Sequence, residues 1–147
     1  MLASMRNGSG DDYFILFNAH GVIIKGFAHE SPMSPYATAT GKPWPGVLDD
    51  VPTEFDNFLS EPAFSIGDVT FCLWRRYTDA SWQMGTIHYP AGRDPDGSEE
   101  LLSILDGEPS TYRAFAEEYY EQDIDTTVIE HIHQHRPLTD DIISALN

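Results

Sequence analysis

The stretch Val69-Thr-Phe-Cys-Leu-Trp74 decides the fold that this sequence predicts. β-Branched and aromatic side chains follow one another in it, which is typical of a strand packed inside a sheet. Side chains on a strand alternate between its two faces, so Phe71 and Leu73 would share one face, opposite to Cys72. Both faces are apolar, and we therefore expect this strand to be covered on both sides.

Two β-hairpins are predicted around this strand. A turn at residues 77–81 would lead to a returning strand at residues 82–89. Residues 12–18 and 22–27 would form the second hairpin, with Gly21 free to adopt a positive φ in its turn. The two hairpins predict an antiparallel sheet of about four strands. The opening residues, 1–11, are expected to be a flexible lead-in.

The rest of the chain predicts helices and one long loop. Residues 28–50 are expected to be a proline-rich loop, because proline removes amide donors and fixes φ. A short helix is predicted at residues 51–59. The C-terminal third has helical spacing of apolar residues, with a last helix capped by Thr139 and continuing to Leu146. We therefore predict an α+β fold, with the sheet packed against helices and with residues 1–147 in a single domain.

Net charge is the strongest global signal in the sequence. The chain has 24 acidic residues against eight lysines and arginines, a formal net charge of −16. Such a charge repels nucleic-acid phosphates and anionic lipids and attracts a basic protein partner. The alternative interpretation is that the acidity only maintains solubility, as would suit a salty cytoplasm.

Three further features concern the location of the protein. The sequence has no run of about 18 apolar residues that would span a bilayer, and we expect no membrane association. Its first residues lack the apolar segment of a secretory signal. Cys72 is the single cysteine, which excludes an internal disulfide, and its position within a strand indicates a buried thiol in a reducing compartment. We therefore expect a cytoplasmic protein.

His29 and Glu30, in the proline-rich loop, are the candidate catalytic residues. A histidine beside a carboxylate can act as a general base, and His20 or His88 would assist if the fold brought either one close. The alternative is a chance pair in a solvated loop. The sequence contains no nucleophile elbow, paired CxxC, HExxH or dinucleotide fingerprint. No cofactor is therefore predicted.

His131, His133 and His135 raise the question of a metal site. Imidazoles bind zinc or nickel. On a helix, however, His131 and His135 share a face from which His133 points away. Histidines near a helix C-terminus are also stabilised there by the helix dipole without any ligand. The sequence leaves metal binding open here, and no metal ligand is assigned.

Five residues are candidates for binding a partner. Arg75 and Arg76 stand at the end of the central strand, where we expect one of them to pair with a carboxylate from the acidic helices; the alternative is an anionic ligand. Tyr36, Trp44 and Tyr77 are interpreted either as the edge of the core or as an exposed recognition patch, because tryptophan and tyrosine dominate binding hot spots.

Several segments resemble those of uncharacterised small bacterial proteins: residues 21–27, 29–31, 33–35, 44–46, 96–102 and 115–120. The resemblance implies no activity and no site. Our first hypothesis is an acidic cytoplasmic binding module, immunity- or inhibitor-like, that docks a basic partner. The alternative is a small hydrolase or metal-dependent enzyme that uses His29 and Glu30. We favour the binding module over the enzyme, and the sequence predicts no oligomeric state.

Overall fold

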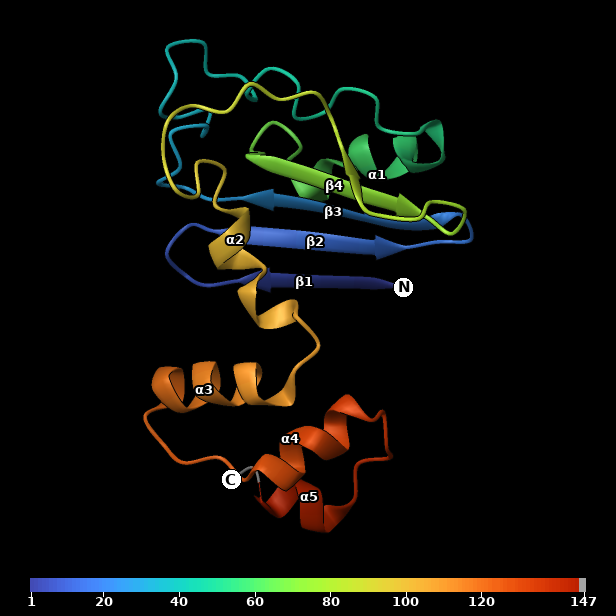
Figure 1. Ribbon diagram of the computed structural model, residues 1–147, viewed down its shortest axis with the longest axis vertical. Helices are drawn as coiled ribbons and strands as arrows, with labels where there is room; N and C mark the ends of the chain where they lie inside the picture. Colours follow the sequence, from blue (N-terminus) through green and yellow to red (C-terminus); the bar gives the residue numbers. More distant parts are fainter. Residues whose placement is uncertain (146–147) are drawn as a thin grey trace. The chain divides into compact units, whose positions relative to one another are not determined.

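The computed structural model describes residues 1–145, in which the chain divides into two compact units. The N-terminal unit, Met1–Leu101, contains an antiparallel sheet, and the C-terminal unit begins at Leu102 and is helical (Figure 1). The predicted α+β class is confirmed. Leu146, which was expected to extend the last helix, lies outside the described residues.

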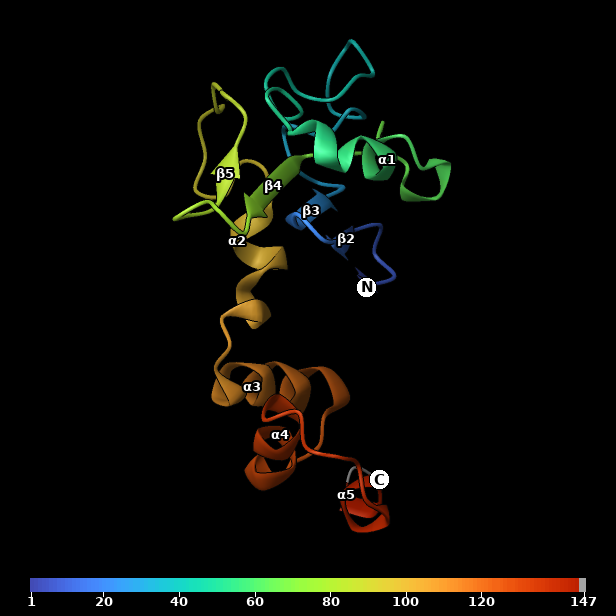
Figure 2. The ribbon, with the colours of Figure 1, turned by 90° about the vertical axis from the view of Figure 1, so that its right-hand side faces the viewer.

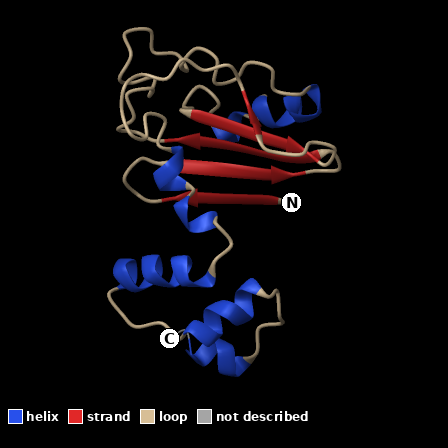
Figure 3. Ribbon diagram, viewed as in Figure 1, coloured by secondary structure: helices blue, strands red, loops and turns tan. Residues whose placement is uncertain are grey.

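The sheet has five antiparallel strands in the order β1-β2-β3-β4-β5 (Figure 3). They are β1 (Leu2–Arg6), β2 (Asp12–Phe17), β3 (Gly21–Phe27), β4 (Phe71–Arg76) and β5 (Gln83–Met84). The prediction that residues 1–11 form a flexible lead-in was wrong, because Leu2–Arg6 pairs along the whole of β2. A short segment without a strong pattern of its own becomes a strand here because the neighbouring strand offers it a free edge.

The last strand is shorter than predicted. Only Gln83 and Met84 of the segment 82–89 pair with β4. The chain then leaves the sheet at Gly85, where it passes so close to the backbone of Gly46 that a Cβ at Gly85 would collide with the Gly46 carbonyl oxygen. Contact with the proline-rich loop therefore ends this strand.

The proline-rich loop contains no helix or strand over the predicted residues 28–50, and it is firmly anchored. The Ser31 hydroxyl donates to the Pro95 carbonyl at 2.7 Å and accepts the Met33 amide at 2.9 Å. The side chains of Met33 and Val47 are fully buried. The loop thus contributes to the core. It leads into η1 (Thr53–Phe55), α1 (Asp56–Leu59) and η2 (Pro62–Phe64).

One face of the sheet carries the main core. The strand registers place Phe14 opposite Lys25, and Lys25 opposite Cys72, on this face. The residues that complete the cluster include Ile23, Trp74, Val69, Phe55 and Phe58, together with Met33 and Val47 from the loop. The core is therefore built between the sheet and the segment that connects β3 to β4.

Lys25 is fully buried within this core. Its Nζ lies 3.0 Å from Oδ1 of Asp12. The same ammonium stands 5.6 Å from the ring centroid of Phe14 and 5.9 Å from that of Phe27. A carboxylate and two ring faces therefore replace the water that a buried ammonium loses.

The opposite face of the sheet buries Tyr13, Ile15, Ile24 and Phe71. Phe71 lies across β3 so closely that a Cβ on Gly26 would overlap its ring, which explains a glycine in the middle of this strand.

Thr70 connects the sheet to the end of the unit, because its hydroxyl donates to the Asp96 carbonyl at 2.7 Å. The helix α2 (Ser98–Leu101) follows.

The C-terminal unit consists of η3 (Ser103–Leu105), α3 (Pro109–Tyr120), α4 (Thr126–His133) and α5 (Asp140–Ala145). α3 and α4 pack against each other (Figure 2). Asp125 caps the N-terminus of α4, because its carboxylate accepts the Thr127 amide at 2.8 Å. No helix among residues 1–145 has the length and apolar character needed to cross a bilayer.

Candidate functional site

His29 and Glu30 lie directly after β3, where they form a pair at the surface. Nδ1 of His29 is 2.9 Å from Oε1 of Glu30, and the side chains are 48% and 95% exposed. The His29 amide donates to Asp11 Oδ1 at 2.7 Å. The His29 ring lies 6.2 Å from the rings of Phe27 and Tyr36. The hydrogen bond of the His29 amide and the two neighbouring rings therefore hold His29 in place.

His20 and His88, which were expected to assist His29 if the fold brought either one close, have other surroundings. His20 belongs to the turn before β3, whereas His29 follows its end. Seven strand residues separate the two by roughly 20 Å. The contact found for His88 is its backbone carbonyl, which accepts the indole N–H of Trp44 at 3.1 Å. His20 is therefore too far from His29 to relay a proton for it.

A pocket of about 330 Å³ lies beside the pair. Its lining includes the carboxylates of Asp11, Glu30, Asp94 and Glu100. Two of these carboxylates already accept backbone hydrogen bonds: Asp11 from the His29 amide, and Asp94 from the amides of Glu99 and Glu100 at 3.1 and 2.9 Å. Among residues 1–145, no three histidine, cysteine or carboxylate side chains are grouped to hold a metal ion.

The histidines near the C-terminus serve different local contacts. His131 Nε2 lies 2.8 Å from the Pro137 carbonyl oxygen, and the ring of His133 is 6.4 Å from that of Tyr112. His135 follows the end of α4 with a φ of 53°. The His131 ring therefore contacts the chain that leaves α4, the His133 ring faces α3, and the backbone of His135 takes part in the exit from the helix.

Cys72 is buried beside Lys25 in the sheet. Burial raises the pKa of its thiol to about 12. At neutral pH the thiol therefore stays protonated, and it is unsuited to act as a nucleophile.

The aromatic residues predicted to bind a partner do not form one patch. Tyr77 is 70% exposed and donates to the Asn18 carbonyl at the β2–β3 turn. Tyr36 is 69% exposed and lies at the other end of β3, against Phe27. Its hydroxyl donates to Asp68 at 2.9 Å, and this hydrogen bond raises the pKa of Tyr36. Trp44 packs against the core.

The two arginines at the end of β4 are both engaged within their own turn. Arg76 forms an ion pair with Asp79 at 3.3 Å. The Arg76 amide and side chain together lower the pKa of the Asp79 carboxyl. Arg75 donates to the carbonyls of Asp79 and Ala80 at 3.3 and 3.5 Å. The expected carboxylate partner is thus found, but it comes from the hairpin turn, whereas the prediction placed it on an acidic helix.

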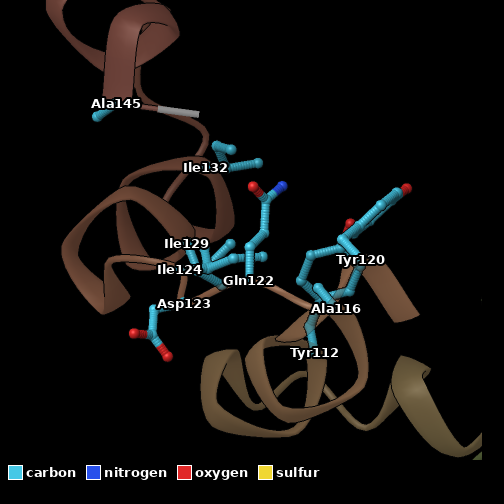
Figure 4. A pocket seen from close by; sticks show the side chains of 9 residues that line it. All are labelled: Tyr112, Ala116, Tyr120, Gln122, Asp123, Ile124, Ile129, Ile132 and Ala145. Atoms are coloured by element: carbon cyan, nitrogen blue, oxygen red, sulfur yellow. The ribbon is translucent and has the colours of Figure 1, made fainter. Parts of the chain in front are cut away.

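The C-terminal unit contains an apolar pocket between α3 and α4, with a volume of about 350 Å³ (Figure 4). Tyr112, Ala116 and Tyr120 line it from α3. Further apolar lining comes from Ile124, Ile129, Ile132 and Ala145, and polar lining comes from Gln122 and Asp123. α3 supplies one residue per turn to this wall, because positions 112, 116 and 120 share a helix face.

A row of aromatic rings continues from this pocket along α3. Phe115 stacks on Tyr119 with ring centroids 5.7 Å apart, and Tyr119 meets Tyr120 edge-on at 5.0 Å. Phe115 is 41% exposed and Tyr119 is 61% exposed. Tyr112, Phe115, Ala116 and Tyr119 have helical spacing in the sequence, but this spacing alone assigns no binding role to them. The sequence did contain one signal for such a site: a stripe of aromatic residues on a predicted helix that has few apolar partners.

The surroundings of the pocket are acidic. Residues 102–147 contain ten carboxylates but only two arginines, Arg113 and Arg136. Arg113 is already neutralised, because its Nε donates to Glu117 at 2.7 Å. The Ile124 amide and Arg113 together lower the pKa of Glu117. Near neutral pH the unit therefore carries a net negative charge, and one of its carboxylates, that of Asp123, belongs to the residues that line the pocket.

Comparisons with protein-family models, with curated proteins and with solved structures found no match. The resemblance to small bacterial proteins accordingly stays a prediction, and the function has to be argued from the site itself.

Proposed function

We propose that this protein is a cytoplasmic, acidic binding module, immunity- or inhibitor-like, that docks a basic segment of another protein in the α3–α4 pocket. The observation that carries the proposal is the open apolar pocket, continued by exposed aromatic rings, within a strongly acidic unit.

The size and lining of the pocket favour side chains of a protein partner. A volume of about 350 Å³ is at the lower end of the range for ligand sites and suits one or two apolar side chains. Tyrosine is among the residues that most often dominate binding energy. Tyr112 and Tyr120 present rings whose conformational entropy is small, so ordering them on binding costs little.

The charge distribution favours a basic partner. With Arg113 held by Glu117, Arg136 is the other arginine in this unit. Lysines and arginines on either side of an apolar anchor would be attracted by the net negative charge of this unit, which would speed association and make it sensitive to salt. An amphipathic helix with an apolar stripe and basic flanks has this chemistry.

Two synthetic helical peptides test the proposal. They share one apolar face and carry either lysine or glutamate on the flanks. Fluorescence anisotropy should show that the lysine peptide binds and is weakened by salt, whereas the glutamate peptide does not bind. Ile132→Lys, inside the pocket, should weaken binding roughly tenfold or more.

Leu138→Lys is the matched control variant. Leu138 is exposed, belongs to the same unit and does not line the pocket. It adds the same charge as Ile132→Lys and should change affinity only slightly. Equal losses in the two variants would mean that net charge alone attracts the peptide, and the pocket would then have no role.

A small hydrolase is the second candidate function, favoured by the 2.9 Å contact of His29 with Glu30 beside the pocket of about 330 Å³. Hydrolysis of activated esters that is lost in His29→Ala and retained in His88→Ala would support it. Equal rates in the wild-type protein and in both variants would exclude it.

A further inference from the structure

The outer edge of β1 has backbone groups that point away from the sheet. Phe17 and Met1 exchange two hydrogen bonds of 2.9 Å between their backbone groups. Hydrogen-bonded pairs alternate along an antiparallel ladder. The register therefore makes Ala3–Ile15 and Met5–Tyr13 the next hydrogen-bonded pairs.

The next strand pair gives the same assignment independently. The Asn18 amide donates to the Gly21 carbonyl at 3.0 Å. Because hydrogen-bonded positions alternate, the even-numbered residues of β2 also direct their backbone groups toward β3. Its odd-numbered residues must then face β1. The amides and carbonyls of Leu2, Ser4 and Arg6 consequently point outward.

This edge is open. Within residues 1–145, no hydrogen bond outside the sheet reaches the backbones of Leu2, Ser4 or Arg6, and all three residues are exposed. β1 has no proline and no bulge, the usual devices that protect an edge strand from pairing. The opposite edge of the sheet is the two-residue strand β5, which offers much less backbone.

We infer that a second copy of this chain pairs with β1 in antiparallel orientation, around a two-fold axis at Ser4. Ser4 would face Ser4 of the second copy, and Leu2 would face Arg6. Each of these pairs would exchange two hydrogen bonds, since the outward groups repeat at every second residue. The five-stranded sheet would continue across the axis as one sheet.

Within β1 itself, the local charge favours a second copy over a basic strand, in contrast to the net charge of the whole chain. Arg6 is the charged residue of β1, and a basic strand would bring like charge against it. In the symmetric pairing Arg6 stands opposite Leu2. Its guanidinium lies 5.7 Å from the Phe14 ring centroid, over the sheet face and clear of the edge.

Cysteine crosslinking tests the position of the axis. Ser4→Cys should form a disulfide-linked dimer under mild oxidation, because directly opposite residues lie within disulfide reach. In Ala3→Cys the Cα atoms of the two cysteines would lie roughly 8 Å apart, beyond that reach, so this variant should still dimerise but should form no disulfide between the two copies. Cys72 is buried and does not interfere. Equal crosslinking of both variants would overturn the register.

Sedimentation of the full chain tests the association itself. The mass should rise with protein concentration toward that of two chains. It should rise further with salt, because two copies of net charge −16 repel each other. Docking of a basic partner responds to salt in the opposite direction, so failure of one proposal does not imply failure of the other.

Ser4→Pro removes one outward amide and should abolish the dimer, while its circular dichroism stays that of the wild type. Ser4→Lys should do the same by opposing two ammonium groups while leaving the backbone unchanged. A wild-type protein that stays monomeric at every concentration and salt level would overturn the inference, as would a dimer that both variants retain.

Discussion

The two units of this protein bury apolar side chains to very different extents. Residues 1–101 enclose a core in which Ile23, Met33, Val47 and Phe55 are fully buried. Among residues 102–145, the buried apolar side chains are Ala116, Val128 and Ile129. A sheet joins segments distant in sequence and covers them on both faces, whereas short helices leave part of their apolar surface exposed. The comparison suggests that the first unit provides stability and the second provides contact surface.

The two units can be followed separately in solution. Trp44, Trp74 and Trp82 all belong to residues 1–101, so tryptophan fluorescence reports on the first unit. The long helices α3 and α4 belong to the second unit and dominate the far-ultraviolet circular dichroism. The two signals therefore distinguish the unfolding of one unit from that of the other.

The largest effect is expected from Phe55→Ala. Removing a fully buried ring should lower the free energy of unfolding by about 3–5 kcal/mol, through lost transfer energy and the cavity left behind. Urea denaturation followed by tryptophan fluorescence measures it. A loss below about 1 kcal/mol would show that the core of the first unit is not tightly packed.

Lys25→Met should cost about 3 kcal/mol, because it leaves the Asp12 carboxylate without its partner. The value is at the low end for buried pairs, since the Asp12 side chain keeps 20% exposure. The double variant Lys25→Met with Asp12→Leu should recover most of the loss. Failure to recover it would mean that the ammonium has a packing role beyond neutralising Asp12.

Val128→Ala should lower the stability of the second unit by about 1.6 kcal/mol, the value for two buried methyl groups. The loss should appear in circular dichroism and leave the tryptophan transition unchanged. A shift of both transitions together would show that the two units unfold as one, which would weaken the comparison.

Acid should affect the second unit first, and this is the smallest effect. Hydrogen bonds lower the pKa values of Asp106, Glu117 and Asp125. A carboxyl whose folded pKa is below its unfolded pKa stabilises the fold above the unfolded value and loses that contribution as pH falls through the folded value. Ellipticity should therefore decline below the ordinary values of 4.5 for glutamate and 3.8 for aspartate.

The matched variant for this titration is Asp125→Asn, which removes one of the three shifted groups and should flatten the decline. In the first unit, Asp79 is the carboxyl with a lowered pKa among the described residues, so tryptophan fluorescence should change less over the same range. A fluorescence change that precedes the loss of ellipticity would contradict the prediction.

The sequence predicted the long, regular elements well. β4, the β2–β3 hairpin, the proline-rich loop, α3 and α4 were all expected, because each has a strong local pattern of β-branched residues, proline or helical spacing. β1 was missed because five residues with little pattern become a strand only when β2 lies beside them. β5 was overextended because the close approach of Gly85 to Gly46 joins segments about 40 residues apart.

The candidate site was predicted less well than the fold. His29 and Glu30 do form a pair, since neighbouring residues need no tertiary structure to meet. Tyr36 and Tyr77 were grouped on residue type, and the sheet places them at opposite ends of β3. The α3–α4 pocket was missed because spacing shows which residues share a face but not whether another element covers it.

The sequence by itself determined the α+β class, the acidic charge and the order of the main elements, because these depend on composition and on contacts between near neighbours. The tertiary structure alone decided that Lys25 is buried against Asp12, that β1 forms an open edge, and that the aromatic face of α3 stays exposed. Each of these depends on which distant segment comes to lie beside a residue, and no local pattern encodes that choice.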